Sequence, residues 1–134
     1  MTIAKYFPFT LYFSFLISCQ TDIGRQHPEK AKQLYSEGMK ILEYRISIQS
    51  ADKEKALMFN KKAIEKFSDS YKADTAFAEP VLFASECTMY AKDYQNCVYW
   101  TSKLMLLDTS QRNLIFCKDR IGYCNSQLRS RQEK

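Results

Sequence analysis

Apolar residues recur at steps of three and four along most of the chain, from about residue 29 onward. This spacing places apolar side chains on one face of an α-helix and leaves the opposite face polar. Short runs rich in Ser, Thr and Asp separate the periodic stretches, and such side chains suit helix N-caps. The pattern predicts helices over residues 29–48, 52–67, 72–91, 93–107 and 111–129.

Pro80 is the one residue that conflicts with this pattern, because proline inside a helix removes a backbone hydrogen bond and causes a kink. Either the third helix begins near Glu79, or it is long and bent there. The chain has only three Gly and three Pro, which favours helices over a turn-rich β-sandwich. Since the breaks are short, neighbouring helices should be antiparallel. We therefore expect an all-α fold of about five helices.

The first residues have a different character. Lys5 precedes an apolar stretch, from Tyr6 to Ile17, that is too short to span a membrane but is typical of a secretory signal. The sequence Leu16-Ile17-Ser18-Cys19 resembles the bacterial lipobox. This resemblance implies cleavage before Cys19, a diacylglycerol group on its thiol and stable anchoring by more than one acyl chain.

The chain accordingly divides into a signal peptide (1–18), a lipidated cysteine with a flexible tether (19–28) and a helical domain (29–134). The tether carries the only histidine, His27, which we expect to be solvent-exposed. Gln20 follows the lipidated cysteine. Because Asp at this place retains lipoproteins in the inner membrane of Gram-negative bacteria, Gln20 favours the outer membrane.

Two stretches of the helical domain, 52–67 and 93–108, resemble the second half of the tetratricopeptide repeat, with Ala56 and Cys97 at its small-residue position. The resemblance implies an α-solenoid of stacked helix pairs in which Gly38 and Gly122 lie where helices pack closely. Ala56 and Cys97 are 41 positions apart, whereas the consensus period is about 34. Longer helices would account for this, and a plain helical bundle is the alternative.

In this repeat family the first helix of each pair lines a concave groove that binds a peptide or helix of another protein. The resemblance places the following residues in the groove: Lys32, Tyr35, Met39, Glu43, Leu82, Glu86, Met89, Tyr90, Asp119, Tyr123 and Gln127. Some of these residues would instead pack inside a compact domain. Residues 111–129 would cap the stack with a polar outer face, listed as Arg112, Lys118, Asp119, Arg120, Asn125 and Arg129.

Composition excludes several kinds of chemistry. The net charge is +5, with acidic and basic residues interleaved, so the chain lacks the basic stripe of a nucleic-acid-binding protein. A single histidine and the lack of a Gly-rich loop argue against a metal centre, a nucleophilic triad or a phosphate site. We expect no cofactor and no catalytic residue. Glu79 and Glu86 are seven apart and could form a paired-acid site, which is the alternative.

Four cysteines follow Cys19, and an oxidising compartment would allow them to pair. Cys117 and Cys124 would lie about 10 Å apart along one helix, too far for an unstrained bond. The candidate pairs are Cys87 with Cys97, and Cys97 with Cys124. The alternative is that all four are small core residues with free thiols.

These observations favour a lipid-anchored adaptor or assembly protein of the bacterial cell envelope, which binds another protein and is not an enzyme. An immunity or inhibitor lipoprotein that blocks a toxin or an envelope hydrolase is the second hypothesis. An envelope enzyme is the third.

Overall fold

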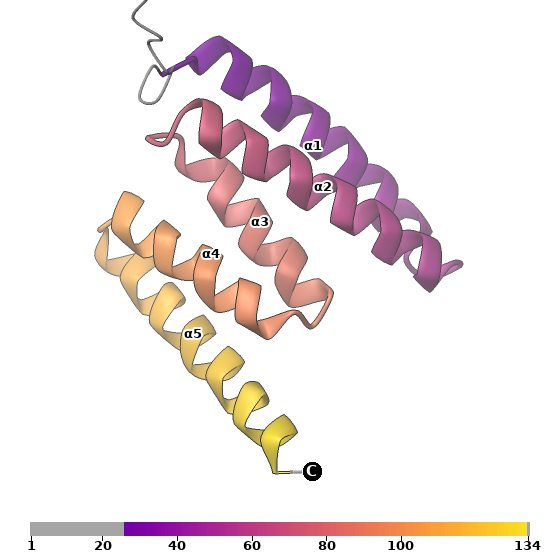
Figure 1. Ribbon diagram of the computed structural model, residues 1–134, viewed down its shortest axis with the longest axis vertical. Coiled ribbons are helices and arrows are strands. Elements are labelled where there is room, and N and C mark those ends of the chain that lie inside the picture. Colours follow the sequence, from indigo (N-terminus) through magenta and orange to yellow (C-terminus); the bar gives the residue numbers. More distant parts are fainter. Residues whose placement is uncertain (1–25, 134) are drawn as a thin grey trace, which may run out of the picture.

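The computed structural model describes residues 26–133, which form five helices and no strand. The helices are α1 (Pro28–Ile48), α2 (Lys53–Ala73), α3 (Ala78–Tyr90), α4 (Tyr94–Leu107) and α5 (Gln111–Gln132). Consecutive helices run in opposite directions (Figure 1). The predicted all-α fold of antiparallel helices is confirmed for this part of the chain. The predicted signal peptide and lipidated Cys19 lie outside it.

Three of the breaks contain the side-chain caps that the sequence predicts. Asp52 accepts a hydrogen bond from the Lys55 amide at 2.9 Å and starts α2. Asp93 accepts one from Asn96 at 3.2 Å, and Ser110 accepts one from Asn113 at 3.4 Å. Each cap satisfies an amide of the first helical turn that has no partner within the helix.

The predicted break at residues 68–70 is wrong, because α2 continues to Ala73. The Ser70 hydroxyl donates to the Ala31 carbonyl of α1 at 2.7 Å, so this serine joins two helices instead of ending one. The chain turns only at Asp74, whose extended backbone amide donates to the Ser70 carbonyl at 3.1 Å.

The two interpretations of Pro80 are resolved in favour of a short third helix. Since α3 begins at Ala78, Pro80 lies in its first turn, where a backbone N–H has no helical partner to lose. The predicted start at residue 72 is therefore wrong.

The main core draws on all five helices and surrounds Phe67 of α2, which is completely buried. Tyr35 packs its ring against Phe67, Phe77 and Phe83, with ring centroids 5.2–6.0 Å apart. A smaller core holds α4 to α5 through Tyr94, Cys97 and Cys124. Each helix therefore buries one face against its neighbours, as stacked helix pairs require.

Two glycines differ in how closely their helices pack. Gly38 is buried, and a Cβ atom there would come within 2.7 Å of the Phe67 ring, so the expected close approach is confirmed. Gly122 is exposed, and a Cβ atom would meet nothing within 4 Å, so the same expectation is wrong there. The polar outer face of α5 is also only partly confirmed, because the Arg120 side chain is 11% exposed.

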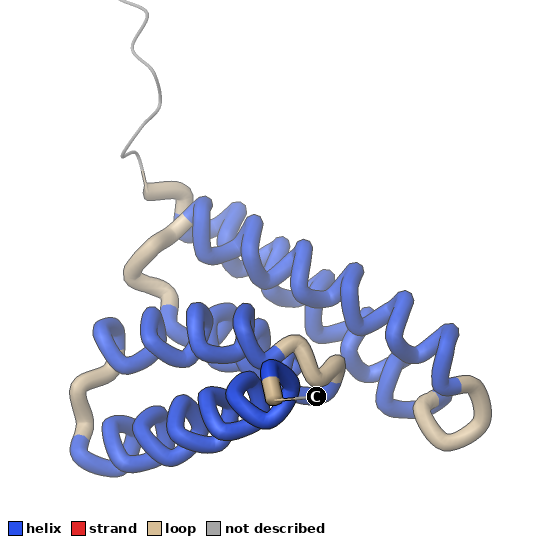
Figure 2. The backbone as a smooth tube through the Cα atoms, turned by 60° about the horizontal axis from the view of Figure 1, so that its bottom comes forward, coloured by secondary structure: helices blue, strands red, loops and turns tan. Residues whose placement is uncertain are grey.

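The helix pair α1–α2 is longer than the pair α3–α4, with 21 residues in each helix against 13 and 14. Figure 2 shows the turn between α1 and α2 extending well past the other helices. In Figure 1, α3 lies behind α2 and α4, which leaves these two helices on the same side of the molecule.

Candidate functional site

A groove of about 800 Å³ lies between α2 and α4, and its floor is the C-terminal end of α3. Its lining residues are Leu57, Asn60, Lys61, Ile64, Glu65, Ser68, Asp69 and Lys72 from α2, Thr88 and Ala91 from the end of α3, and Asp93, Asn96, Tyr99 and Trp100 from the start of α4. The groove exists because α3 separates α2 from α4.

Asn60 is the polar group at the bottom of this groove. Its side-chain nitrogen donates to the Cys87 carbonyl at 2.7 Å, which joins α2 to α3. Its Oδ1 atom is buried and has no hydrogen-bond partner among the described residues. Asn60 is 1% exposed, so this oxygen lies beneath the surface of the groove, and the role of the residue here is to hold α2 to α3.

An aromatic wall forms the α4 side of the groove. The rings of Trp100 and Tyr99 meet edge to face at 5.1 Å, and Trp100 also meets Tyr71 of α2 at 6.2 Å. The Lys103 ammonium lies 4.9 Å from the Tyr99 ring and 5.3 Å from the Tyr71 ring. Trp100 is buried while Tyr99 is 52% exposed, so Tyr99 offers an accessible apolar surface above a fixed ring.

Charged side chains of both signs form the α2 rim of the groove. Lys61, Glu65, Asp69 and Lys72 follow one another at steps of three and four and are all exposed. Lys72 pairs with Asp69 at 3.1 Å. An aromatic wall facing a charged rim is typical of a protein-binding surface.

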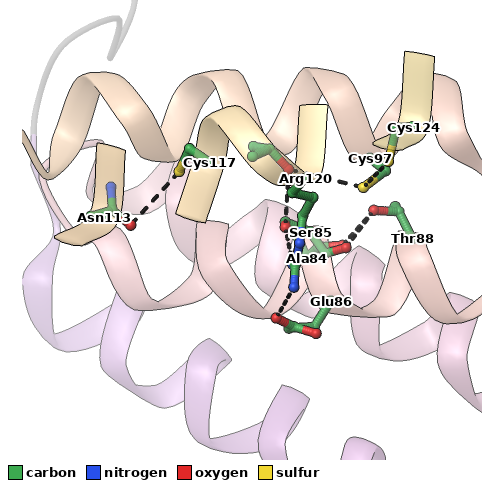
Figure 3. A network of polar contacts seen from close by, with 10 residues as sticks. Ala84, Ser85, Glu86, Thr88, Cys97, Asn113, Cys117, Arg120 and Cys124 are labelled. Carbon is green, nitrogen blue, oxygen red and sulfur yellow. Dashed lines mark hydrogen bonds and ion pairs between the residues drawn. The ribbon is translucent and has the colours of Figure 1, made fainter. Parts of the chain in front are cut away.

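The predicted groove residues lie elsewhere, along α1, α3 and α5. Side-chain contacts connect these three helices, because the Arg45 guanidinium of α1 stacks 4.1 Å over Tyr90 of α3. Arg120 of α5 reaches α3 by donating to Ser85 at 2.7 Å and pairing with Glu86 at 2.5 Å (Figure 3). These side-chain contacts link α1 with α3 and α3 with α5, whereas a shared binding groove along the three helices stays a prediction.

Burial divides the predicted groove residues into three groups. Four of them pack against the cores: Tyr35, Met39, Leu82 and Met89. Burial, together with the nearby Glu79 carboxylate, raises the pKa of the Tyr35 hydroxyl. Glu86, Tyr90 and Gln127 are half-buried, and four others are exposed: Lys32, Glu43, Asp119 and Tyr123. None of the predicted residues lines the α2–α4 groove, so their role in binding stays a prediction.

The α2–α4 groove was not identified from the sequence, although one signal for it was present. Asn60 lies four residues after Ala56 and three before Ala63, so it is a polar side chain on the buried face of α2. A polar residue at such a position needs a partner, and this points to the floor of a site.

Within residues 26–133, no group of three or more His, Cys, Asp or Glu side chains is placed to hold a metal ion. The helices of the same region include none with the length and apolarity needed to cross a membrane. No family model, curated protein or solved structure matches the chain.

Proposed function

We propose that this chain is a lipid-anchored, protein-binding module of the bacterial cell envelope, and that a helix or peptide of another envelope protein docks in the α2–α4 groove. The observation that carries the binding proposal is this groove, in which the exposed Tyr99 ring packs against the buried Trp100 ring. The sequence Leu16-Ile17-Ser18-Cys19 supports the anchoring proposal.

A partner's apolar side chain would pack against Tyr99, Leu57 and Ile64. Aromatic anchors of this kind contribute much of the binding energy in protein interfaces, because their rings bury a large area at low entropic cost. The rim places two acidic side chains between two basic ones, so these charges would select the register of the partner more than they would increase its affinity.

Site-specific photo-crosslinking in living cells tests the docking site. A benzophenone amino acid replaces Tyr99 in one strain and Tyr123 in another; these two tyrosines are 52% and 50% exposed and belong to different helices. We expect a crosslinked protein from position 99 and none from position 123. A product from position 123 alone would favour the surface of α1, α3 and α5 that the sequence predicts.

The absence of a product from both positions, with the protein present at normal level, would contradict protein binding altogether. Mass spectrometry of the crosslinked band identifies the partner. A resident envelope protein supports an adaptor, whereas a toxin or hydrolase supports an inhibitor.

The anchoring proposal has a separate test. Metabolic labelling with an alkyne fatty acid should mark the wild-type chain and fail to mark Cys19→Ala. Thr21→Ala, two positions away, is the matched control and should keep the label. A Cys19→Ala protein that carries the label or stays in the detergent phase would show that Cys19 is not the anchor.

A further inference from the structure

The thiols of Cys97 on α4 and Cys124 on α5 meet at the centre of the smaller core (Figure 3). Their Sγ atoms are 3.0 Å apart, and both side chains are completely buried. A disulfide bond has a length of roughly 2.05 Å, so the sulfur atoms need to move only about 1 Å closer to form one.

The other two cysteines are occupied elsewhere in the fold. Cys117 lies in the main core, where its thiol contacts Asn113 Oδ1 of its own helix at 3.7 Å. Cys87 also belongs to the main core, beside the Arg45 guanidinium. The Cys97 thiol has one further contact, the Thr101 hydroxyl at 3.9 Å. Of the two pairings that the sequence leaves open, the structure brings together Cys97 and Cys124.

We propose that Cys97 and Cys124 form a disulfide bond that locks α5 covalently onto α4 in the exported protein, an inference that takes its oxidising compartment from the proposed function. The oxidant is a disulfide, either of a thiol oxidoreductase or of glutathione. One cysteine thiolate attacks this disulfide and releases a thiolate, forming a mixed disulfide. The second thiolate then attacks the mixed disulfide. Two protons leave the cysteines, and two electrons reduce the oxidant to two thiols.

The order of events follows from burial. Desolvation and the neighbouring Cys97 raise the pKa of the Cys124 thiol to about 12, so the folded protein holds very little of the reactive thiolate. The bond therefore forms while α5 is still separated from α4, and packing afterwards shields it from reduction. It joins residues 27 positions apart and removes loop entropy from the unfolded chain.

The positions of lysine and arginine make the pairing straightforward to determine. Trypsin places the four cysteines in four different peptides, 73–92, 93–103, 113–118 and 121–129. The experiment uses the full chain carrying Cys19→Ala, reduced and unfolded in urea and then refolded by dilution into mild detergent that contains glutathione disulfide. Non-reducing digestion should yield peptide 93–103 joined to peptide 121–129. A link to 73–92 or 113–118, or four free thiols, would overturn the proposal.

Thermal unfolding gives a second readout. The oxidised chain should melt higher than the reduced chain by on the order of 10 °C. Cys124→Ala should abolish this difference, while Cys117→Ala, the matched change on the same helix, should retain it. An equal melting temperature for oxidised and reduced wild type would contradict the covalent lock.

Analysis of the bond in living cells separates this inference from the proposed function. Thiols are blocked with an alkylating reagent at harvest, and the isolated wild-type chain is digested as above. The joined peptides in this sample support both the bond and export. A bond that forms with glutathione disulfide but is missing from cells would leave the pairing intact and count against export.

Discussion

At the scale of single residues, the approach of α1 to α2 depends on the missing side chain of Gly38. The Phe67 ring fills the space that a Cβ atom would occupy, and this ring lies at the centre of the main core. Protein interiors are close-packed, so a methyl group added here would have to displace the ring.

Gly38→Ala should therefore lower the free energy of unfolding by about 1–3 kcal/mol, even though alanine is the better helix former. Gly122→Ala is the control, because the added methyl group enters open space on α5. There we expect a gain of roughly 0.5–1 kcal/mol from helix propensity alone. Urea unfolding measures both. Equal effects at the two positions would show that Phe67 yields easily.

The Cys87 thiol should make the protein sensitive to alkali. Desolvation raises its pKa from 9.0 to about 11, although the Arg45 guanidinium offsets part of this rise. Because the folded pKa exceeds the unfolded one, the contribution to stability is complete below about pH 9 and is lost as the pH rises toward 11. The loss should reach on the order of 1 kcal/mol by about pH 10.

Cys87→Ala should remove this part of the decline in unfolding free energy between neutral pH and about pH 10. Urea titrations at several pH values give the slope of unfolding free energy against pH. Any loss of stability that the substitution causes at every pH leaves this slope unchanged. Parallel curves for the two proteins would mean that the Cys87 thiol has the same pKa in the folded and unfolded chains.

At the scale of helices, the sequence predicts the starts that have a local side-chain cap, but it misplaces the break between α2 and α3. Asp52, Asp93 and Ser110 are caps that act on residues three positions later, so local sequence contains the whole signal. Ser70 resembles a helix end in sequence, yet it bonds to Ala31, a residue 39 positions away. Such a partner exists only after the helices pack, and so the end of α2 could not be predicted.

Arg120 is the residue that connects α5 to α3. It donates to Ser85, pairs with Glu86 and stacks 4.3 Å over the Phe116 ring. We expect Arg120→Lys to lower the free energy of unfolding by about 1–2 kcal/mol, because an ammonium cannot donate to two partners in the plane of a guanidinium. The loss is limited because the half-exposed Glu86 carboxylate regains water. Arg129→Lys, on the exposed face of the same helix, should change stability by less than about 0.5 kcal/mol.

Hydrogen exchange locates the effect of Arg120→Lys. Amides of α5 should exchange faster than in the wild type. Amides of α1 should still exchange only when the whole domain unfolds. Uniformly faster exchange in all helices would mean that α5 does not open separately.

At the scale of the molecule, the sequence predicts the stacking of helix pairs but not the position of the groove. Apolar periodicity identifies which face of each helix is buried, and this is enough to predict an all-α fold. The groove depends on the angle between α1–α2 and the shorter helices, to which many side chains contribute. Only Asn60, a polar residue on a buried face, marks it in the sequence.

The sharing of one core among all five helices predicts that the described domain unfolds in a single transition. The main core takes Leu42 from α1, Phe67 from α2, Val81 from α3, Trp100 from α4 and Cys117 from α5. Trp100 is the only tryptophan of the chain, so its fluorescence reports on α4, whereas circular dichroism reports on all the helices. The two urea transitions should coincide.

A substitution in another helix of the shared core sharpens the test. Phe67→Leu in α2 should shift both transitions together by about 1–2 kcal/mol, because loss of packing at one helix weakens the shared core. Leu106→Ala, which removes a side chain that is 78% exposed, should shift neither. If circular dichroism changed before Trp100 fluorescence, α1–α2 would unfold separately. The chain would then behave as a solenoid of independent repeats, in which only neighbouring helix pairs stabilise one another.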